Sequence, residues 1–66
     1  MTYDNIVYEQ YDEVRQSGVC NMWDIGCVYH YAEDEGLYEI AWVAASGSDH
    51  YAVVLREYEE WKEGQG

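Results

Sequence analysis

The chain reads VRQSGVCNMWD over residues 14–24, a run that holds the signals for one helix end and one helix start. Arg15 complements the negative C-terminal end of a helix dipole, and Gly18 favours the left-handed backbone that ends many helices. Asn21 is a good N-cap for the next helix, with Asp24 in the position of a capping-box acid. The run therefore predicts two helices separated by a short turn.

Apolar side chains on both sides of this run recur at helical spacing. Upstream, a stripe at i, i+4 and i+7 predicts a helix over residues 4–17, with Asp4 at its N-cap or in its first turn. Downstream, a second stripe predicts a helix that runs from Met22 to about Glu35 and is closed by Gly36. The two stripes consist of Val7, Tyr11 and Val14, and of Met22, Ile25, Tyr29 and Ala32.

The region after Gly36 fits two structures. Residues 37–45 alternate like a strand, yet their three alanines also favour a helix. Residues 46–49, Ser-Gly-Ser-Asp, are a turn signal, and residues 50–56 alternate and are rich in β-forming side chains.

We therefore expect an α+β fold, a small single domain over residues 1–66 in which two N-terminal helices precede a short β-hairpin of residues 38–45 and 50–57. A mostly α fold with a third helix at 37–46 is the alternative. Residues 57–63 are expected to continue as a short helix, and residues 64–66 to form a frayed tail.

The chain is strongly acidic. It carries 14 Asp and Glu against 3 Lys and Arg, a formal net charge of −11. Such a field repels nucleic acid and anionic membranes and attracts basic surfaces. The aromatic content of 17% separates the chain from disordered acidic tails, which are poor in aromatics. We expect a folded monomer that contacts a basic partner and binds neither nucleic acid nor membrane directly.

Two cysteines and two histidines are the candidates for metal or catalytic chemistry. Cys27 and His30 are three residues apart, with Cys20 nearby, but the paired spacing of strong zinc sites is missing. No nucleophile elbow, glycine-rich phosphate loop or two-histidine metal motif is present. We expect no catalysis, no metal and no cofactor.

The cysteines also bear on the compartment. The sequence shows neither a signal-peptide pattern nor an apolar stretch long enough to span a membrane. We therefore expect the protein in a reducing cytoplasm, where a Cys20–Cys27 disulfide is not favoured.

The acidic residues gather in clusters, of which two are the candidate partner-binding residues. These are Glu9, Asp12 and Glu13, and Glu33, Asp34 and Glu35. Helix neighbours three and four apart have Cβ atoms about 5–6 Å apart, so their carboxylates approximate the spacing of phosphates. A channel lined with Lys and Arg that binds DNA through its phosphates can attract such carboxylates. Interleaved Tyr and Trp would anchor the contact.

One set of residues in the middle of the chain matches a known pattern: Val14-Arg15, Ser17-Gly18, Asn21-Met22, Asp24, Val28, Ala32, Gly36 and Tyr38-Glu39. On these residues, roughly 6–40 of the chain resemble a family of small phage-encoded proteins of unknown function. The resemblance implies a helix beyond Tyr38, against the hairpin, and it implies no catalytic or binding residues.

Taken whole, the chain also resembles phage anti-CRISPR proteins, especially acidic inhibitors of the type I-C Cascade complex, in its size, its acidity and its phage-like core. This resemblance implies a DNA mimic that occupies the basic, DNA-reading surface of Cascade in the cytoplasm of the bacterial host and blocks target-DNA recognition. Two alternatives are a phage modulator of another nucleic-acid-binding host protein and a salt-adapted acidic housekeeping domain.

Overall fold

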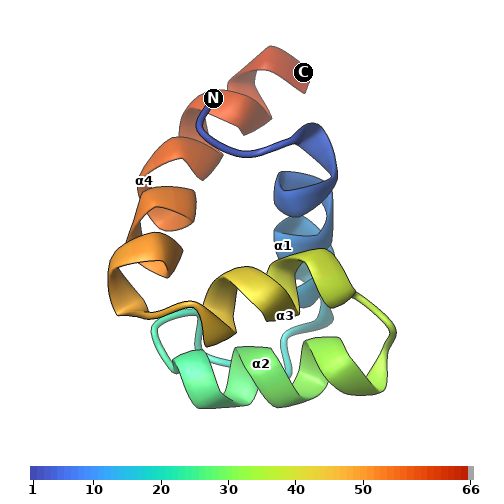
Figure 1. Ribbon diagram of the computed structural model, residues 1–66. Helices are drawn as coiled ribbons and strands as arrows, with labels where there is room; N and C mark the ends of the chain where they lie inside the picture. The colour runs from blue at the N-terminus through green and yellow to red at the C-terminus, as the bar shows by residue number, and fades with distance from the viewer. Residues whose placement is uncertain (66) are drawn as a thin grey trace.

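The computed structural model describes residues 1–65, which form four α-helices and no strand. The helices are α1 (Asn5–Ser17), α2 (Ile25–Asp34), α3 (Tyr38–Ala45) and α4 (Ser48–Gln65). In Figure 1, α1 and α4 stand on opposite sides, and α2 and α3 lie across their lower ends as an antiparallel pair. The two ends of the chain lie close to each other at the upper end.

One core joins the four helices, and its largest members are aromatic residues between α1 and α4. The ring centroids of Tyr11 and Tyr58 are 4.7 Å apart, and Trp61 stacks on Tyr8 with centroids 6.0 Å apart. Between α2 and α3, which share the most extensive helix contact, the core consists of small and β-branched residues. These are Val28, Ala32, Ile40, Ala41, Val43 and Ala44.

The core has no phenylalanine, so buried hydroxyls must find partners. The Tyr8 hydroxyl donates to Glu57 Oε1 at 2.7 Å, and the Tyr51 hydroxyl donates to the Met22 carbonyl at 2.7 Å. Within residues 1–65, every buried side-chain nitrogen or oxygen has a hydrogen-bond partner. The tyrosine tips therefore add hydrogen bonds between distant segments to the apolar contact of their rings.

The predicted first helix is confirmed, and the start of the second is corrected. Asp4 is the N-cap of α1, and Gly18 ends it with a left-handed φ of 70°. Helix α2 begins at Ile25, because the Asp24 side chain accepts from the Cys27 N–H at 3.1 Å and acts as the N-cap. Asn21 instead caps a preceding turn, since its side chain accepts from the Trp23 N–H at 2.9 Å.

The predicted hairpin of residues 38–45 and 50–57 is wrong, and with it the α+β fold class. Both segments are helical, and the third helix that we kept as the alternative is present as α3. The alternating pattern of residues 50–56 overlaps a helical stripe of apolar residues, and the prediction followed the alternation. Along α4, buried side chains recur every three or four residues, well past the end of the expected strand. They are Tyr51, Val54, Tyr58 and Trp61.

The expected turn is shorter than predicted, and two residues of the expected tail are helical. Ser46 and Gly47 alone connect α3 to α4, which starts at Ser48. The last helix includes the expected short helix 57–63 and continues through Gly64 and Gln65, which we expected to fray. Gly66 lies outside the described residues.

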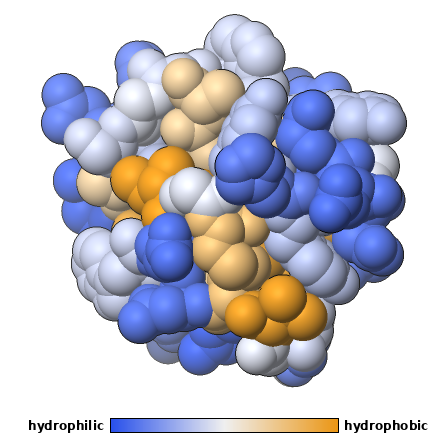
Figure 2. Space-filling model, turned by 90° about the horizontal axis from the view of Figure 1, so that it is seen from below, coloured by the Kyte–Doolittle hydropathy of each residue, from blue (hydrophilic) through white to orange (hydrophobic). Residues whose placement is uncertain are grey.

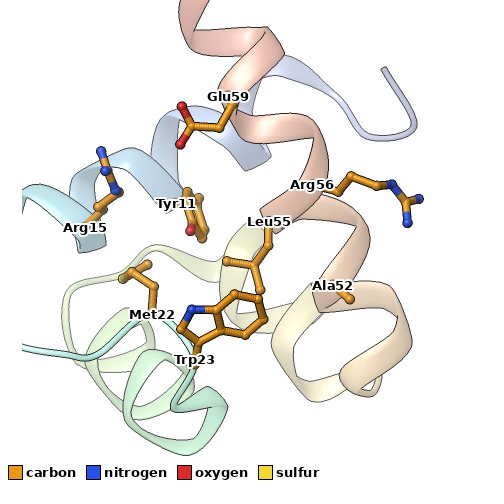
Figure 3. A pocket seen from close by; sticks show the side chains of 8 residues that line it. All are labelled: Tyr11, Arg15, Met22, Trp23, Ala52, Leu55, Arg56 and Glu59. Carbon is orange, nitrogen blue, oxygen red and sulfur yellow. The ribbon is translucent and has the colours of Figure 1, made fainter.

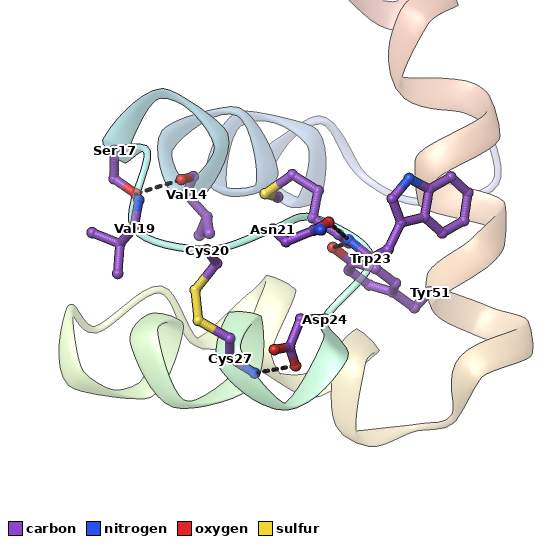
Figure 4. The surroundings of a disulfide bond; sticks show 10 residues. Val14, Ser17, Val19, Cys20, Asn21, Trp23, Asp24, Cys27 and Tyr51 are labelled. Carbon is purple, nitrogen blue, oxygen red and sulfur yellow. Dashed lines mark hydrogen bonds between the residues drawn. A yellow bond between two sulfur atoms is a disulfide. The ribbon is translucent and has the colours of Figure 1, made fainter.

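The expectation that Cys20 and Cys27 do not form a disulfide is also wrong. The two residues are bonded, with Cα atoms 5.8 Å apart. Figure 4 shows the bond linking the segment after α1 to the first turn of α2. The turn at Asn21 and the cap at Asp24 fold the intervening residues back, and this brings the Cα atoms within the usual disulfide range. Spacing along the sequence did not reveal this reversal.

Candidate partner-binding surface

The first acidic cluster divides into two exposed residues and one that is tied to the fold. Glu9 and Glu13 are exposed on α1. Asp12 Oδ1 accepts hydrogen bonds from the Tyr58 hydroxyl and, at 3.3 Å, from Lys62 Nζ. The hydrogen bond from Tyr58 is the main reason that the pKa of Asp12 lies below its ordinary value. Asp12 therefore holds α1 against α4 and is a poor candidate for partner contact.

The second acidic cluster is exposed at the end of α2. Asp34 is the last residue of this helix and Glu35 its C-cap, and Glu33 directly precedes Asp34 in the last turn. All three side chains are exposed. Gly36, with a φ of 75°, then reverses the chain into α3. The cluster thus sits on the tight turn that joins the two short helices.

A hydrogen bond brings these two clusters to the same part of the molecule. The Ile40 N–H, near the start of α3, donates to Gln10 Oε1 of α1 at 3.0 Å. This contact satisfies one of the unpaired N–H groups at a helix start. Glu9 directly precedes Gln10, Glu13 is its helix neighbour three residues on, and Glu39 precedes Ile40. In Figure 1, α1 and the turn from α2 to α3 lie on the same side.

We call this region the acidic edge, and it comprises Glu9, Glu13, Glu33, Asp34, Glu35 and Glu39. The structure therefore leaves five of the six predicted residues exposed, on elements at the same side of the molecule, and holds Asp12 within a helix–helix contact. Glu39 was not predicted, because its segment was assigned to a strand.

The few basic residues are absent from the α2 and α3 part of the acidic edge, although Arg15 and Lys62 lie near its α1 part. Residues 16–55 contain six Asp and Glu and no Lys or Arg. Lys62 pairs with Asp12, and the Arg15 guanidinium lies 5.3 Å from the centroid of the Tyr58 ring. These two cations and Arg56 belong to α1 and α4. Charge is therefore segregated, with no cation in α2, α3 or the loops that flank them.

The acids of α4 are partly used by the fold. Glu57 accepts from the Tyr8 hydroxyl at 2.7 Å and from the Thr2 N–H and hydroxyl at 3.0 and 2.8 Å. These hydrogen bonds, that from Tyr8 first, lower the pKa of Glu57 to about 2. Glu59, Glu60 and Glu63 are exposed on the same helix.

Two hollows meet at Trp23, whose indole is 76% exposed. The larger, about 350 Å³, is lined by Tyr11, Met22 and Leu55 with Arg15, Arg56 and Glu59 among its charged residues. The smaller, about 250 Å³, shares Trp23 and Leu55 and adds Asp49. In Figure 3, the carboxylate of Glu59 points toward the side of Arg15, whereas Arg56 extends outward. These two hollows were not predicted, since residues from three separate segments line them.

Exposed apolar residues were also not predicted as part of any site. On α3, Tyr38 is 63% and Trp42 is 67% exposed, and Val19 is exposed before α2. Figure 2 views the molecule from the α2 end and shows an apolar band between groups of hydrophilic side chains. A helical spacing of four residues between Tyr38 and Trp42 was the signal that could have found the aromatic pair.

No metal site emerges among the described residues. Cys20 and Cys27 are bonded to each other, which removes the thiols considered with His30 as ligands. Residues 1–65 contain no group of three or more His, Cys, Asp or Glu side chains that could hold a metal ion. In the same range, no helix is both long and apolar enough to cross a bilayer.

Comparison with known proteins gives a family without a known activity. No curated protein and no solved structure matches the chain. The model of a family described as a domain of unknown function (DUF5049) matches residues 3–54, which span α1, α2, α3 and the start of α4. This agrees with the resemblance of the central residues to a family of unknown function. Because the match covers most of the 66 residues, the chain belongs to the DUF5049 family.

Proposed function

We propose that this protein is an anti-CRISPR protein that acts as an acidic mimic of DNA. It binds the basic, DNA-reading surface of the type I-C Cascade complex in the cytoplasm of the bacterial host and blocks target-DNA recognition. It acts stoichiometrically as a monomer, without catalysis or a cofactor.

The observation that carries this proposal is the acidic edge together with the absence of Lys and Arg from residues 16–55. The exposed carboxylates of Glu33, Asp34, Glu35 and Glu39 have no Lys or Arg in their own helices or the turn between them, so their negative charge is available to a partner. A surface that normally attracts phosphates is drawn to such a field, and the attraction weakens as salt rises. Two acids that the fold uses, Asp12 and Glu57, lie outside this edge.

The arrangement also supports mimicry through spacing. Glu9 and Glu13 lie four residues apart on α1, where Cβ atoms of helix neighbours are about 5–6 Å apart. Glu33, Asp34 and Glu35 continue the negative surface across the turn into α3. Several carboxylates at short intervals can engage several phosphate-binding side chains at once. One isolated pair would contribute little at an exposed surface.

The experiment measures binding of purified type I-C Cascade and the gel shift of its target DNA. The test variant reverses the second cluster, E33K/D34K/E35K. The matched control reverses three exposed acids of α4, E59K/E60K/E63K, and changes the net charge by the same amount. We expect the wild type and the control to bind Cascade and abolish the DNA shift, and the test variant to lose both effects.

Other outcomes correct the proposal in different ways. Equal loss of Cascade binding in both variants would mean that net charge alone determines binding and that the acidic edge is not the contact surface. Binding of the wild type without loss of the DNA shift would mean interference after recognition. No binding at physiological salt would reject Cascade as the target and leave another nucleic-acid-binding host protein as the partner.

A further inference from the structure

Helix α3 presents an aromatic pair that nothing in the fold uses. Tyr38 and Trp42 are 63% and 67% exposed, although the opposite face of the same helix is fully buried. They are four residues apart, so they lie one above the other on a single face. The buried residues Ile40, Ala41, Val43 and Ala44 already anchor α3, and the pair is therefore free to contact another molecule.

The surroundings of this pair are acidic. Glu39 is the helix neighbour of Trp42 at three residues' distance, and Tyr38 follows Glu35 after the turn at Gly36. Both Glu35 and Glu39 are exposed, and α2, α3 and the turn between them contain no Lys or Arg. The aromatic pair is thus flanked by the exposed carboxylates of Glu35 and Glu39, with no cation in its own helix or in the helix before it.

The other exposed tryptophan stands in a setting of mixed charge. Trp23 is 76% exposed, and the hollows that it lines include Arg15 and Arg56, two of the three cations of the chain, together with Glu59 and Asp49. A cationic partner is attracted to the negative face of an indole ring and repelled by neighbouring guanidinium groups. Charge complementarity therefore favours Trp42 over Trp23 for contact with a basic surface.

We infer that Tyr38 and Trp42 are the aromatic anchors by which this protein binds the arginine and lysine side chains of a basic, phosphate-binding protein surface. This inference rests on the proposed function and specifies which contacts make the complex tight. The carboxylates attract the partner from a distance, and the rings stack on guanidinium groups and on the apolar stems of the same side chains. Aromatic residues at the centre of an interface commonly dominate its affinity.

The first test measures affinity for type I-C Cascade. Truncation of the anchor in W42A should weaken binding at least tenfold, and Y38A should weaken it less. The control W23A removes a more exposed indole from the other surface and should bind like the wild type. Because all three side chains are exposed, circular dichroism of the variants should match that of the wild type. If wild type and W42A bind equally well, the inference is overturned while the proposed function stands.

A second test does not depend on Cascade. A peptide of nine arginines is titrated into W23F, in which Trp42 is the one highly exposed indole, and into W42F, in which Trp23 has that role. We expect the fluorescence to change in W23F and to stay constant in W42F. If the arginine peptide changes the fluorescence of Trp42 but Cascade does not bind the protein, Cascade is rejected as the target and the role of Trp42 as an anchor is supported. An equal or larger response of Trp23 would overturn the inference.

Discussion

Removal of the Cys20–Cys27 disulfide should destabilise this fold without abolishing it. The bond closes a loop with a sequence separation of 7. In the chain-entropy model, a loop of this length restricts the unfolded chain by about 2.5 kcal/mol at 25 °C. A domain of this size has a total unfolding free energy on the order of 3–10 kcal/mol. The reduced chain should therefore remain mostly folded.

The native loop has other contacts that hold it in place. The Asp24 cap on the Cys27 N–H and the turn at Asn21 do not depend on the sulfur atoms. The Tyr51 hydroxyl, at 2.7 Å from the Met22 carbonyl, ties the middle of the loop to α4. The effect of the bond should consequently come from the unfolded state, since the folded loop keeps its shape.

The assay compares thermal unfolding of C20A/C27A with that of the wild type, with and without dithiothreitol. The reduced wild type and the variant should coincide, with melting temperatures about 10–20 °C below that of the oxidised wild type. Dithiothreitol should leave the variant unchanged. A shared midpoint of variant and oxidised wild type would refute the loop-closure argument. An unfolded variant would mean that the helices require the bond, which would contradict a role in a reducing cytoplasm.

Three further changes test individual contacts. The pKa of Glu57 is lowered to about 2, so the stability it contributes is present above the unfolded value near 4.5 and is lost as pH falls toward 2. In E57Q, unfolding midpoints measured from pH 6 to 2 should therefore fall less steeply than in the wild type. Y51F should lose about 1 kcal/mol in urea unfolding, because the Met22 carbonyl loses its donor, and an unchanged midpoint would contradict that assignment. D24A should also cost about 1 kcal/mol by removing the cap on Cys27, whereas Cascade binding should not change.

The sequence predicted the first helix well, because several local signals agreed there. The stripe of Val7, Tyr11 and Val14, the cap at Asp4 and the stop at Gly18 all point to one element. The prediction for the second half of the chain was wrong, because local residue preferences there favoured both strand and helix. Tyrosine and valine favour strands in isolation, and only packing against α1 shows that Tyr51, Tyr58 and their neighbours form one helix face.

The candidate surface was predicted in part. Acidic clusters are visible in the sequence, but their relation in space depends on the Gln10–Ile40 hydrogen bond, which joins residues 30 apart. The structural use of Asp12 depends likewise on the hydroxyl of Tyr58, 46 residues away. Contacts between residues so far apart in the sequence produce no periodic pattern from which they could be predicted. The aromatic pair on α3 was hidden by the strand assignment.

The distribution of acids supports the proposal that the acidic edge contacts a basic partner. Where the fold uses a carboxylate, as at Asp12 and Glu57, it accepts hydrogen bonds from buried tyrosines and its pKa falls. Glu33, Asp34 and Glu35 show the opposite pattern, since they are exposed and crowd the C-terminal end of α2, where the helix dipole disfavours negative charge. Because stability does not explain three acids at this position, a basic partner is the more economical explanation.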